Sequence, residues 1–164
     1  MKRSEEAGYR DYVTTRMEVM RRTAYLLCRD WHLADDLVSI TIGKLYRHWR
    51  RARQVAYLDA YVRRILVRTW LDEKARAWRR EEPAETLPEP PMLPAEDYVV
   101  ERLGLLELLD ALPPRRRAAV VLRYYCDLSV EETAEILECS TGTVKSQTAR
   151  GLDSLRALVA ASRS

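Results

Sequence analysis

Apolar positions recur along the N-terminal half of the chain in steps of three and four residues, the spacing of one face of an α-helix. Three such series predict helices over about 11–28, 33–49 and 57–78. Their apolar stripes are formed by Val13, Met17, Met20, Ala24 and Leu27, by Leu37, Val38, Ile42, Leu45 and Trp49, and by Leu58, Val62, Ile65, Leu66 and Thr69. A single helix of this length is marginal in water, so we expect the three stripes to bury one another in one bundle.

A proline-rich stretch then breaks the helical pattern. Five prolines lie between Glu81 and Pro94, together with several acids, and a helix does not persist through such a segment. The composition is typical of an extended linker. The pattern therefore predicts an N-terminal domain over 1–80, a flexible acidic linker over 81–96 and a C-terminal domain over 97–164.

The C-terminal segment predicts further helices. One spans about 97–111, and the next starts at Pro114, a residue that suits the first helical position, and runs to about Tyr125. Its inward-facing residues are expected to be Ala118, Val121, Leu122 and Tyr125. No segment shows the alternation of a strand, and glycine is scarce. The predicted fold is therefore all-α: two small helical domains, a three-helix bundle and a helix-turn-helix domain, joined by the linker.

The last two predicted helices form a helix-turn-helix. Ser129 and Glu132 make a capping box, Ala134 is the small residue where the helices cross, and Val144 locks them ten positions later. Glu138 occupies the turn position that is often glycine, where a left-handed backbone costs about 1 kcal/mol.

The final helix, capped by Ser140, presents hydrogen-bond donors and no acid on its outer side. These positions are Thr141, Thr143, Lys145, Ser146, Gln147 and Arg150. Glutamine pairs with adenine, and lysine and arginine pair with guanine or phosphate, so this face suits a DNA major groove. The alternative is a capped helical hairpin with a solvated polar face.

Charge is segregated along the chain although the net charge is only +3. Residues 1–80 hold 19 Lys and Arg against 10 Asp and Glu, residues 81–110 hold one against nine, and residues 111–164 hold eight against six. A basic N-terminal domain suggests a phosphate backbone as its partner.

Arginine and tyrosine alternate at the end of the second helix and along the third. The loop expected after the second helix carries Arg50, Arg51, Arg53 and Gln54, and one line of the third carries Tyr57, Tyr61, Arg64 and Arg68. Aromatic rings interleaved with arginine suit unstacked bases held along a nucleic-acid backbone. A solvated face with half-buried tyrosines is equally compatible with the pattern.

Asp35 and Asp36 lie at the start of the second predicted helix. They either stabilise the helix by a favourable interaction with its dipole or form a docking face for a protein.

The sequence lacks the residue patterns of a metal site, an enzyme active site or a membrane span. His32 and His48 lack metal spacing, and Cys28, Cys126 and Cys139 lie far apart, so we expect no metal site, no cofactor and no enzymatic activity. No apolar run approaches the roughly 20 residues that span a bilayer, and no signal-peptide core follows Met1, so we expect a cytoplasmic protein that is not itself a membrane protein.

The chain resembles the extracytoplasmic-function (group IV) sigma factors of bacterial RNA polymerase, in particular their short actinobacterial SigE-like branch. The segments that carry the resemblance are Leu33-Ala34-Asp35-Asp36-Leu37-Val38, Ala60-Tyr61-Val62-Arg63-Arg64-Ile65-Leu66-Val67, and Leu112-Pro113-Pro114-Arg115 through Leu128-Ser129-Val130-Glu131-Glu132 to Gly142-Thr143-Val144-Lys145-Ser146. The resemblance implies a region-2 domain that binds the polymerase clamp and opens the −10 element. It also implies a region-4 domain that binds the flap and the −35 element.

The resemblance assigns roles by position. Asp35, Asp36, Leu37 and Leu45 would face the clamp of core RNA polymerase. The −10 element would be bound by Arg50, Arg51, Arg53, Gln54, Tyr57, Tyr61, Arg64 and Arg68, and the −35 duplex by Thr141, Thr143, Lys145, Ser146, Gln147 and Arg150. Members of this class are often held inactive by an anti-sigma factor, which adds a third partner to core polymerase and promoter DNA.

Four positions depart from the family's pattern. The family usually has a glutamine and an acidic residue where this chain has Ser39 and Ile40. Arg68 stands at a position that is often asparagine, and Glu138 at the turn position that is often glycine. These departures leave open the affinity for core polymerase, the base preference at the −10 element and the stability of the turn.

Two other functions stay as alternatives. One is a stand-alone dimeric helix-turn-helix regulator, which needs symmetric half-sites but no separate basic module. The other is a helical adaptor that does not bind DNA, such as a sigma-like decoy.

Overall fold

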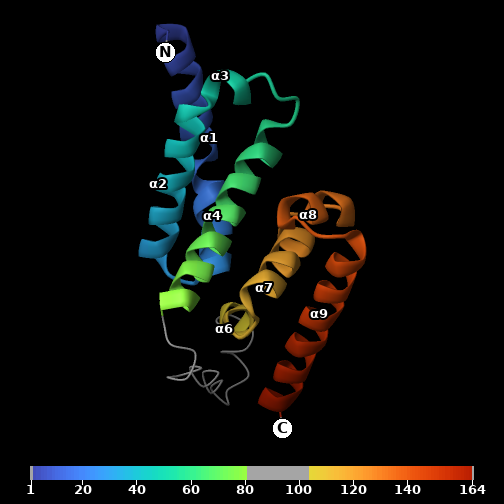
Figure 1. Ribbon diagram of the computed structural model, residues 1–164. Helices are drawn as coiled ribbons and strands as arrows, with labels where there is room; N and C mark the ends of the chain where they lie inside the picture. Colours follow the sequence, from blue (N-terminus) through green and yellow to red (C-terminus); the bar gives the residue numbers. More distant parts are fainter. Residues whose placement is uncertain (1, 81–103, 164) are drawn as a thin grey trace. The chain divides into compact units, whose positions relative to one another are not determined.

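Figure 1 shows the computed structural model of the chain, which describes residues 2–80 and 104–163. The chain divides into two compact units, Met1–Trp70 and Leu71–Ser164. Within the described residues every regular element is a helix, which confirms the predicted all-α fold. The linker predicted over 81–96 lies outside the described residues.

The N-terminal unit is built from α1 (Arg3–Cys28), α2 (Trp31–Arg47), α3 (Trp49–Ala52) and the first part of α4 (Leu58–Arg80). Helix α1 starts eight residues earlier than predicted, and α2 starts two residues earlier. Asp30 caps α2, since its Oδ1 accepts hydrogen bonds from the backbone N–H groups of His32 at 2.8 Å and Leu33 at 3.2 Å. Helices α1 and α2 therefore pack side by side across a two-residue turn.

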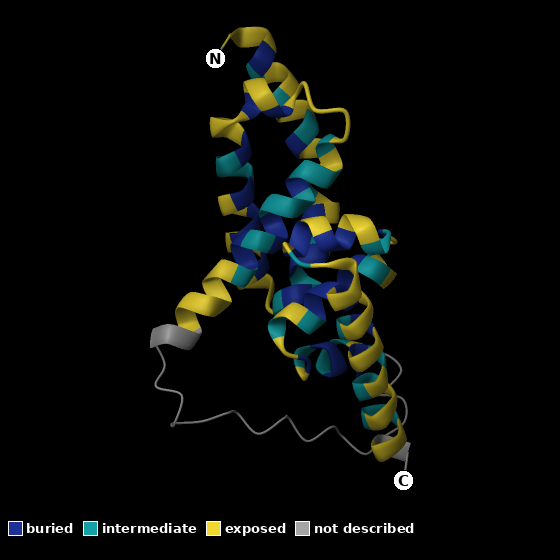
Figure 2. Ribbon diagram, turned by 45° about the vertical axis from the view of Figure 1, so that its right-hand side comes forward, coloured by how far each residue is buried: buried dark blue, intermediate teal, exposed yellow. Residues whose placement is uncertain are grey.

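The predicted apolar stripes form the core of this unit, where buried residues line the inner faces of the helices (Figure 2). Buried members of the stripes are Val13, Met20, Ala24, Leu27, Leu37, Val38, Leu45, Trp49, Val62, Leu66 and Thr69. Removal of such side chains from water is the main stabilising contribution to a bundle of this size. The predicted three-helix bundle is confirmed.

The C-terminal unit contains α6 (Gly104–Asp110), α7 (Pro114–Val120), the π-helical turn η1 (Val121–Tyr125), α8 (Val130–Leu137) and α9 (Thr141–Arg163). Residues 97–103, where the first helix of this unit was predicted to begin, lie outside the described residues. Pro114 is the first residue of α7, as predicted.

Helix α9 packs against both α7 and α8. It approaches α7 closely at Gly151, where an added Cβ would lie 2.6 Å from Val120 Cγ2. Glycine is therefore required for this helix contact.

The prediction that Tyr125 faces inward is wrong, because its side chain is 51% exposed. The residues from Val121 to Tyr125 form a π-helical turn, and the N–H of Cys126 donates to the carbonyl of Val121 at 3.0 Å. This wider i→i+5 turn changes the angular spacing of the side chains. Val121 and Leu122 stay buried, whereas Tyr124 and Tyr125 turn to the surface.

Arg117 is a buried cation in the C-terminal unit, 5% exposed. Its Nη2 donates to the carbonyl oxygens of Asp110 at 3.0 Å and Leu112 at 2.8 Å, and its Nη1 lies 3.5 Å from Asp110 Oδ1. The guanidinium thus satisfies carbonyls at the end of α6 and ties that helix to α7.

None of the described helices is long and apolar enough to cross a bilayer. Across residues 2–80 and 104–163, no three His, Cys, Asp or Glu side chains gather as metal ligands.

Candidate nucleic-acid and polymerase interfaces

Helices α8 and α9 form the predicted helix-turn-helix. Ala134 is 7% exposed and Val144 is fully buried, as expected for the residues that lock the two helices. The capping box is confirmed, since Ser129 Oγ accepts from the Glu132 N–H at 3.0 Å and Glu132 Oε1 accepts from the Ser129 N–H at 3.0 Å. This frame fixes the direction in which α9 leaves the turn.

The turn itself has the left-handed backbone that the sequence suggested. Glu138 has φ 54° and ψ 49°, a conformation that costs a residue with a Cβ about 1 kcal/mol. A guanidinium N–H of Arg115 donates to the carbonyl of Leu137 at the end of α8, and Ser140 Oγ accepts from the N–H of Thr143 at 3.1 Å to cap α9. The strained residue is therefore held between two satisfied helix ends.

The outer side of α9 is exposed at five of the six predicted DNA-contacting positions. The exposed residues are Thr141, Thr143, Lys145, Ser146 and Arg150. Two of them are cations and three carry hydroxyls, and the sequence places no acid between residues 139 and 152. A rigid helix that presents cations and donors without acids has the composition of a major-groove reader.

Gln147 differs from the other predicted readers. It is partly buried, and Arg116 Nε on α7 donates to its Oε1 at 3.2 Å. Bidentate pairing with adenine needs this oxygen as well as the amide NH2. Gln147 can therefore bind adenine in the predicted way only if Oε1 accepts a second hydrogen bond or releases Arg116.

The arginine-rich segment after α2 is partly helical, whereas a loop was predicted there. Trp49–Ala52 form α3, with Trp49 and Ala52 buried beneath it. Arg50, Arg51, Arg53 and Gln54 are exposed. Tyr57 is 77% exposed, and the other predicted positions on α4, Tyr61, Arg64 and Arg68, are partly buried.

A basic hollow that the sequence reasoning missed lies beside α3. It has a volume of about 460 Å³ and is lined by Tyr46, Arg47, His48, Arg50 and Arg51. Tyr46, Arg47 and His48 were overlooked because they end the predicted second helix rather than follow it. The signal was present in the unbroken basic and aromatic run from 46 to 51.

Arg50 and Arg53 share one buried carboxylate. Glu5 on the first turn of α1 is 8% exposed. Its Oε2 lies 3.1 Å from Arg50 Nε, and its Oε1 lies 3.8 Å from Arg53 Nη1. The backbone N–H of Lys2, followed by the Arg50 hydrogen bond, lowers the pKa of Glu5 against the opposing effect of burial. Glu5 is therefore ionised at neutral pH.

A second acid fixes the start of α4. Tyr12 Oη donates to Asp59 Oδ1 at 2.6 Å, and Arg16 Nη2 lies 3.1 Å from Asp59 Oδ2. Burial, followed by the hydrogen bond to Asp59, raises the pKa of Tyr12 far above its usual value. The Tyr12 hydroxyl therefore stays protonated and donates to Asp59, which follows the exposed residue Tyr57 by two positions in the sequence.

The residues predicted to face the clamp separate into two groups. Asp35 and Asp36 are exposed on α2. Leu37 is 5% exposed and Leu45 is fully buried, so the prediction that these two leucines face the clamp is wrong. Both point from α2 into the core of the bundle, where they cannot contact a partner while the unit is folded.

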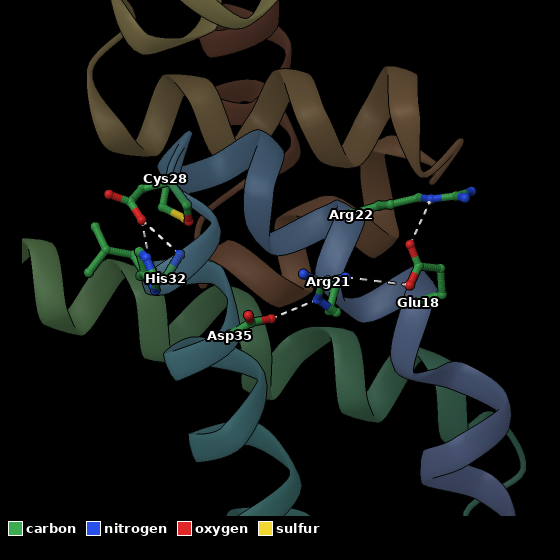
Figure 3. A network of polar contacts seen from close by, with 8 residues as sticks. Glu18, Arg21, Arg22, Cys28, His32 and Asp35 are labelled. Atoms are coloured by element: carbon green, nitrogen blue, oxygen red, sulfur yellow. Dashed lines mark hydrogen bonds and ion pairs between the residues drawn. The ribbon is translucent and has the colours of Figure 1, made fainter.

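Asp35 belongs to a network between α1 and α2 (Figure 3). Arg21 Nε lies 2.7 Å from Asp35 Oδ1, and Arg21 Nη1 lies 3.7 Å from Glu18 Oε2. The Arg21 guanidinium also lies 4.8 Å from the centre of the Trp31 ring, which stacks on Tyr25 at 4.0 Å. Asp35 is thus held in one place on the surface of α2.

Comparisons with known proteins find two family domains in the chain. The sigma-70 region 2 family model matches residues 12–80, and the sigma-70 region 4 model matches residues 102–155. The RNA polymerase sigma-E factor of Streptomyces coelicolor is 39% identical over 93% of this chain and 86% of its own length. The ECF RNA polymerase sigma factor SigE of Mycolicibacterium smegmatis is 38% identical over 82% of this chain and 55% of its own.

A solved structure has the same fold. It is the sigma factor RpoE from Bartonella quintana in complex with the anti-sigma factor NepR, with a TM-score of 0.72, 21% identity, and coverage of 93% of this chain and 96% of that one. These findings do not favour a stand-alone dimeric regulator. The chain belongs to the extracytoplasmic-function group of the sigma-70 family, the transcription initiation factors that direct core RNA polymerase to promoters and begin DNA melting.

Proposed function

We propose that this sigma factor divides promoter recognition between its two units, with α9 on the −35 duplex and the surface of α3 and α4 on the −10 strand. The observation that carries this proposal is the outer side of α9. Thr141, Thr143, Lys145, Ser146 and Arg150 are exposed there together, on a helix braced by a buried Val144. Lys145 and Arg150 supply the contacts to guanine or phosphate, and the hydroxyls orient the helix on the backbone.

On the −10 side, the exposed ring of Tyr57 stacks on a base that has left the duplex, and Arg50, Arg51 and Arg53 contact the adjacent phosphates. Unstacking a base costs a few kcal/mol, and stacking on an aromatic ring returns about 1–3 kcal/mol. Capture of separated bases on this surface therefore favours melting without an active site. This surface continues along α4 with Tyr61, Arg64 and Arg68. Because these three residues are partly buried, they form only the edge of the proposed −10 surface.

For core polymerase, we propose that the exposed acids Asp35 and Asp36 contact the clamp. Leu33 and Ile40 replace the buried Leu37 and Leu45 as the apolar part of this surface, since they are 49% and 39% exposed on the same helix. The C-terminal unit binds the flap. Residues 1–80, 81–96 and 97–164 act as the clamp-binding domain, the linker and the flap-binding domain.

The proposed site of action is the cytoplasm, where promoter DNA and polymerase reside, and the protein acts without a cofactor or an enzymatic activity of its own. The Bartonella quintana neighbour was solved with the anti-sigma factor NepR. On that likeness we add an anti-sigma factor to the partners of this chain, beside core polymerase and promoter DNA.

Run-off transcription tests the function as a whole. Core polymerase, free of other sigma factors, is incubated with a library of genomic promoter fragments, with and without the full chain. We expect discrete transcripts that depend on the chain and share sequence elements at −35 and −10. Core binding without any chain-dependent transcript would instead support a sigma-like decoy.

A further inference from the structure

Glu5 is the one buried carboxylate among the described residues, and it lies outside the part of the chain that the region 2 family model matches, which begins at residue 12. It sits on the first turn of α1, far from α3 in the sequence. Arg50 follows it by 45 residues, yet the two side chains form a hydrogen bond. Glu5 Oε2 also accepts the backbone N–H of Lys2 at 3.2 Å in the capping box of α1, so one carboxylate both caps α1 and binds Arg50.

The contact uses the inner side of the two arginines. Glu5 engages Arg50 through Nε, and the Arg50 side chain is still 68% exposed. Arg53 approaches Glu5 through one terminal nitrogen, Nη1, and its side chain is 43% exposed. A guanidinium has five N–H donors in a fixed plane. Each arginine therefore keeps donors that face solvent while one edge is fixed by Glu5.

Aromatic packing holds α3 against the same turns of α1. Buried Trp49 lies edge-on to Tyr9, with ring centres 5.7 Å apart, and 6.1 Å from Tyr12. A methyl group at Gly8 would lie 3.6 Å from the Trp49 ring, so α1 passes close to α3 here. The first turns of α1 therefore support α3 by direct packing, and Glu5 links these turns to Arg50 and Arg53.

We propose that Glu5 is a positioning residue that holds Arg50 and Arg53 in the orientation in which they bind the phosphates of the −10 strand. This rests on the proposed function of that surface. An arginine loses much rotamer freedom when it binds, and a side chain that is already fixed loses less. Restraint by Glu5 thus favours binding even though its negative charge alone opposes a phosphate.

These two effects of Glu5 have opposite signs, which makes the proposal testable. Glu5→Gln removes one negative charge, as does Glu6→Gln on the adjacent residue, which is only partly buried. Charge alone predicts that both variants bind DNA more tightly. Positioning predicts that Glu5→Gln binds more weakly, whereas Glu6→Gln binds as well as the wild type or slightly better.

The measurement uses the full chain assembled with core polymerase, and fluorescence anisotropy of a labelled single strand that carries the −10 segment of a promoter identified by run-off transcription. We expect Glu5→Gln to weaken binding about threefold, as for loss of a partly exposed ion pair. Equal tightening by Glu5→Gln and Glu6→Gln would overturn the positioning role. A wild-type holoenzyme that does not bind the strand would instead refute the proposed function, and the positioning role with it.

A double-mutant cycle separates positioning from a general effect on folding. If Glu5 acts through the arginines, Glu5→Gln has no further effect on affinity in an Arg50→Gln, Arg53→Gln background. A weakening that persists in that background would contradict the proposal. The salt dependence gives a second readout, because the slope falls by about 0.7 for each phosphate of a single strand that the protein no longer neutralises. We expect a smaller slope for Glu5→Gln, and Glu5→Asp, which keeps the charge, to recover part of it.

Discussion

The two surfaces that we propose for DNA binding are built differently. On α9 the exposed residues Lys145 and Arg150 project from a regular helix, and rigidity comes from the packing of Val144 beneath them. Helix α3 is one turn long, and Arg50 within it and Arg53 directly after it form ion pairs with Glu5. One surface is ordered by apolar packing, and the other by an acid placed behind its cations.

The difference follows from the form of DNA that each surface is proposed to bind. Duplex DNA has a groove of constant width, and a rigid helix matches it without further adjustment. A separated strand has no fixed shape, so its phosphates must be met by side chains whose positions are set by the protein. A short helical turn cannot set them by itself. An internal acid is one way to do so.

Arg117→Ala should have the largest effect, because the order of α9 depends on the scaffold to which Arg117 contributes. The substitution leaves the carbonyls of Asp110 and Leu112 without a donor in a buried site. We expect the free energy of unfolding of the C-terminal unit to fall by about 3 kcal/mol. Urea denaturation followed by circular dichroism measures it, with Arg156→Ala, whose side chain is 77% exposed, as the comparison. An unchanged midpoint for Arg117→Ala would show that the network does not order this unit.

Lys145→Glu should have the next largest effect. It reverses the charge at an exposed position of α9, so we expect affinity for a −35 duplex to fall at least about tenfold. Binding to core polymerase should be unchanged. Electrophoretic mobility shift with holoenzyme and a −35 duplex measures the first, and analytical gel filtration with core the second. Loss of core binding with intact −35 binding would refute the role assigned to α9.

Tyr57→Ala tests the other surface. Removal of a 77% exposed ring should weaken binding of the −10 single strand about tenfold, since one stacked base contributes about 1–3 kcal/mol. Tyr57→Phe keeps the ring and should bind as the wild type does. Affinity for the −35 duplex should be the same in all three proteins. If Tyr57→Ala weakened both equally, the division between the two surfaces would be wrong.

Glu138→Gly should have a smaller effect, in the stabilising direction. Glycine adopts the left-handed backbone at no steric cost, so we expect thermal unfolding to shift upward by the equivalent of up to about 1 kcal/mol. Glu135→Gly, the same change inside α8, should destabilise by about 1 kcal/mol. Differential scanning calorimetry distinguishes the two, and equal shifts would argue against strain at Glu138.

The pH dependence of the Glu5 contact should be the smallest effect, because Arg50 and Arg53 remain partly exposed. The pKa of Glu5 is lowered in the folded protein from an ordinary value of 4.5. The stabilisation that Glu5 contributes is therefore complete above about pH 4.5 and is lost as pH falls through the lowered pKa. Urea midpoints of wild type and Glu5→Gln should differ at pH 6 and converge toward acid pH. A constant difference would show that ionisation of Glu5 is not involved.

Much of the fold could be predicted because its signals are local. The stripes of α1, α2 and α4 recur at helical spacing, and the capping box at Ser129 lies within four residues. The strained position Glu138 was also visible, since the helix-turn-helix spacing fixes where the turn falls. Exposure of the outer positions of α9 followed from the same periodicity.

The errors arose where contacts join distant segments. Periodicity alone put Leu37 and Leu45 on a stripe, and only their burial at 5% and 0% excludes them from a partner surface. Tyr125 was misplaced because a π-helical turn replaces the regular spacing. Gln147 stays a predicted reader, but the spacing did not reveal that Arg116, 31 residues earlier, donates to its amide oxygen.

The sequence by itself determined the helices, their apolar faces, the helix-turn-helix and the segregation of charge, because each depends on residues a few positions apart. It also carried the motifs of the sigma-70 family. The tertiary structure alone decided that Arg50 and Arg53 form ion pairs with Glu5. Glu5 and Arg50 are brought together by the packing of Trp49 against α1. No local rule of spacing predicts a contact between residues 45 positions apart, because it forms only when the core has folded.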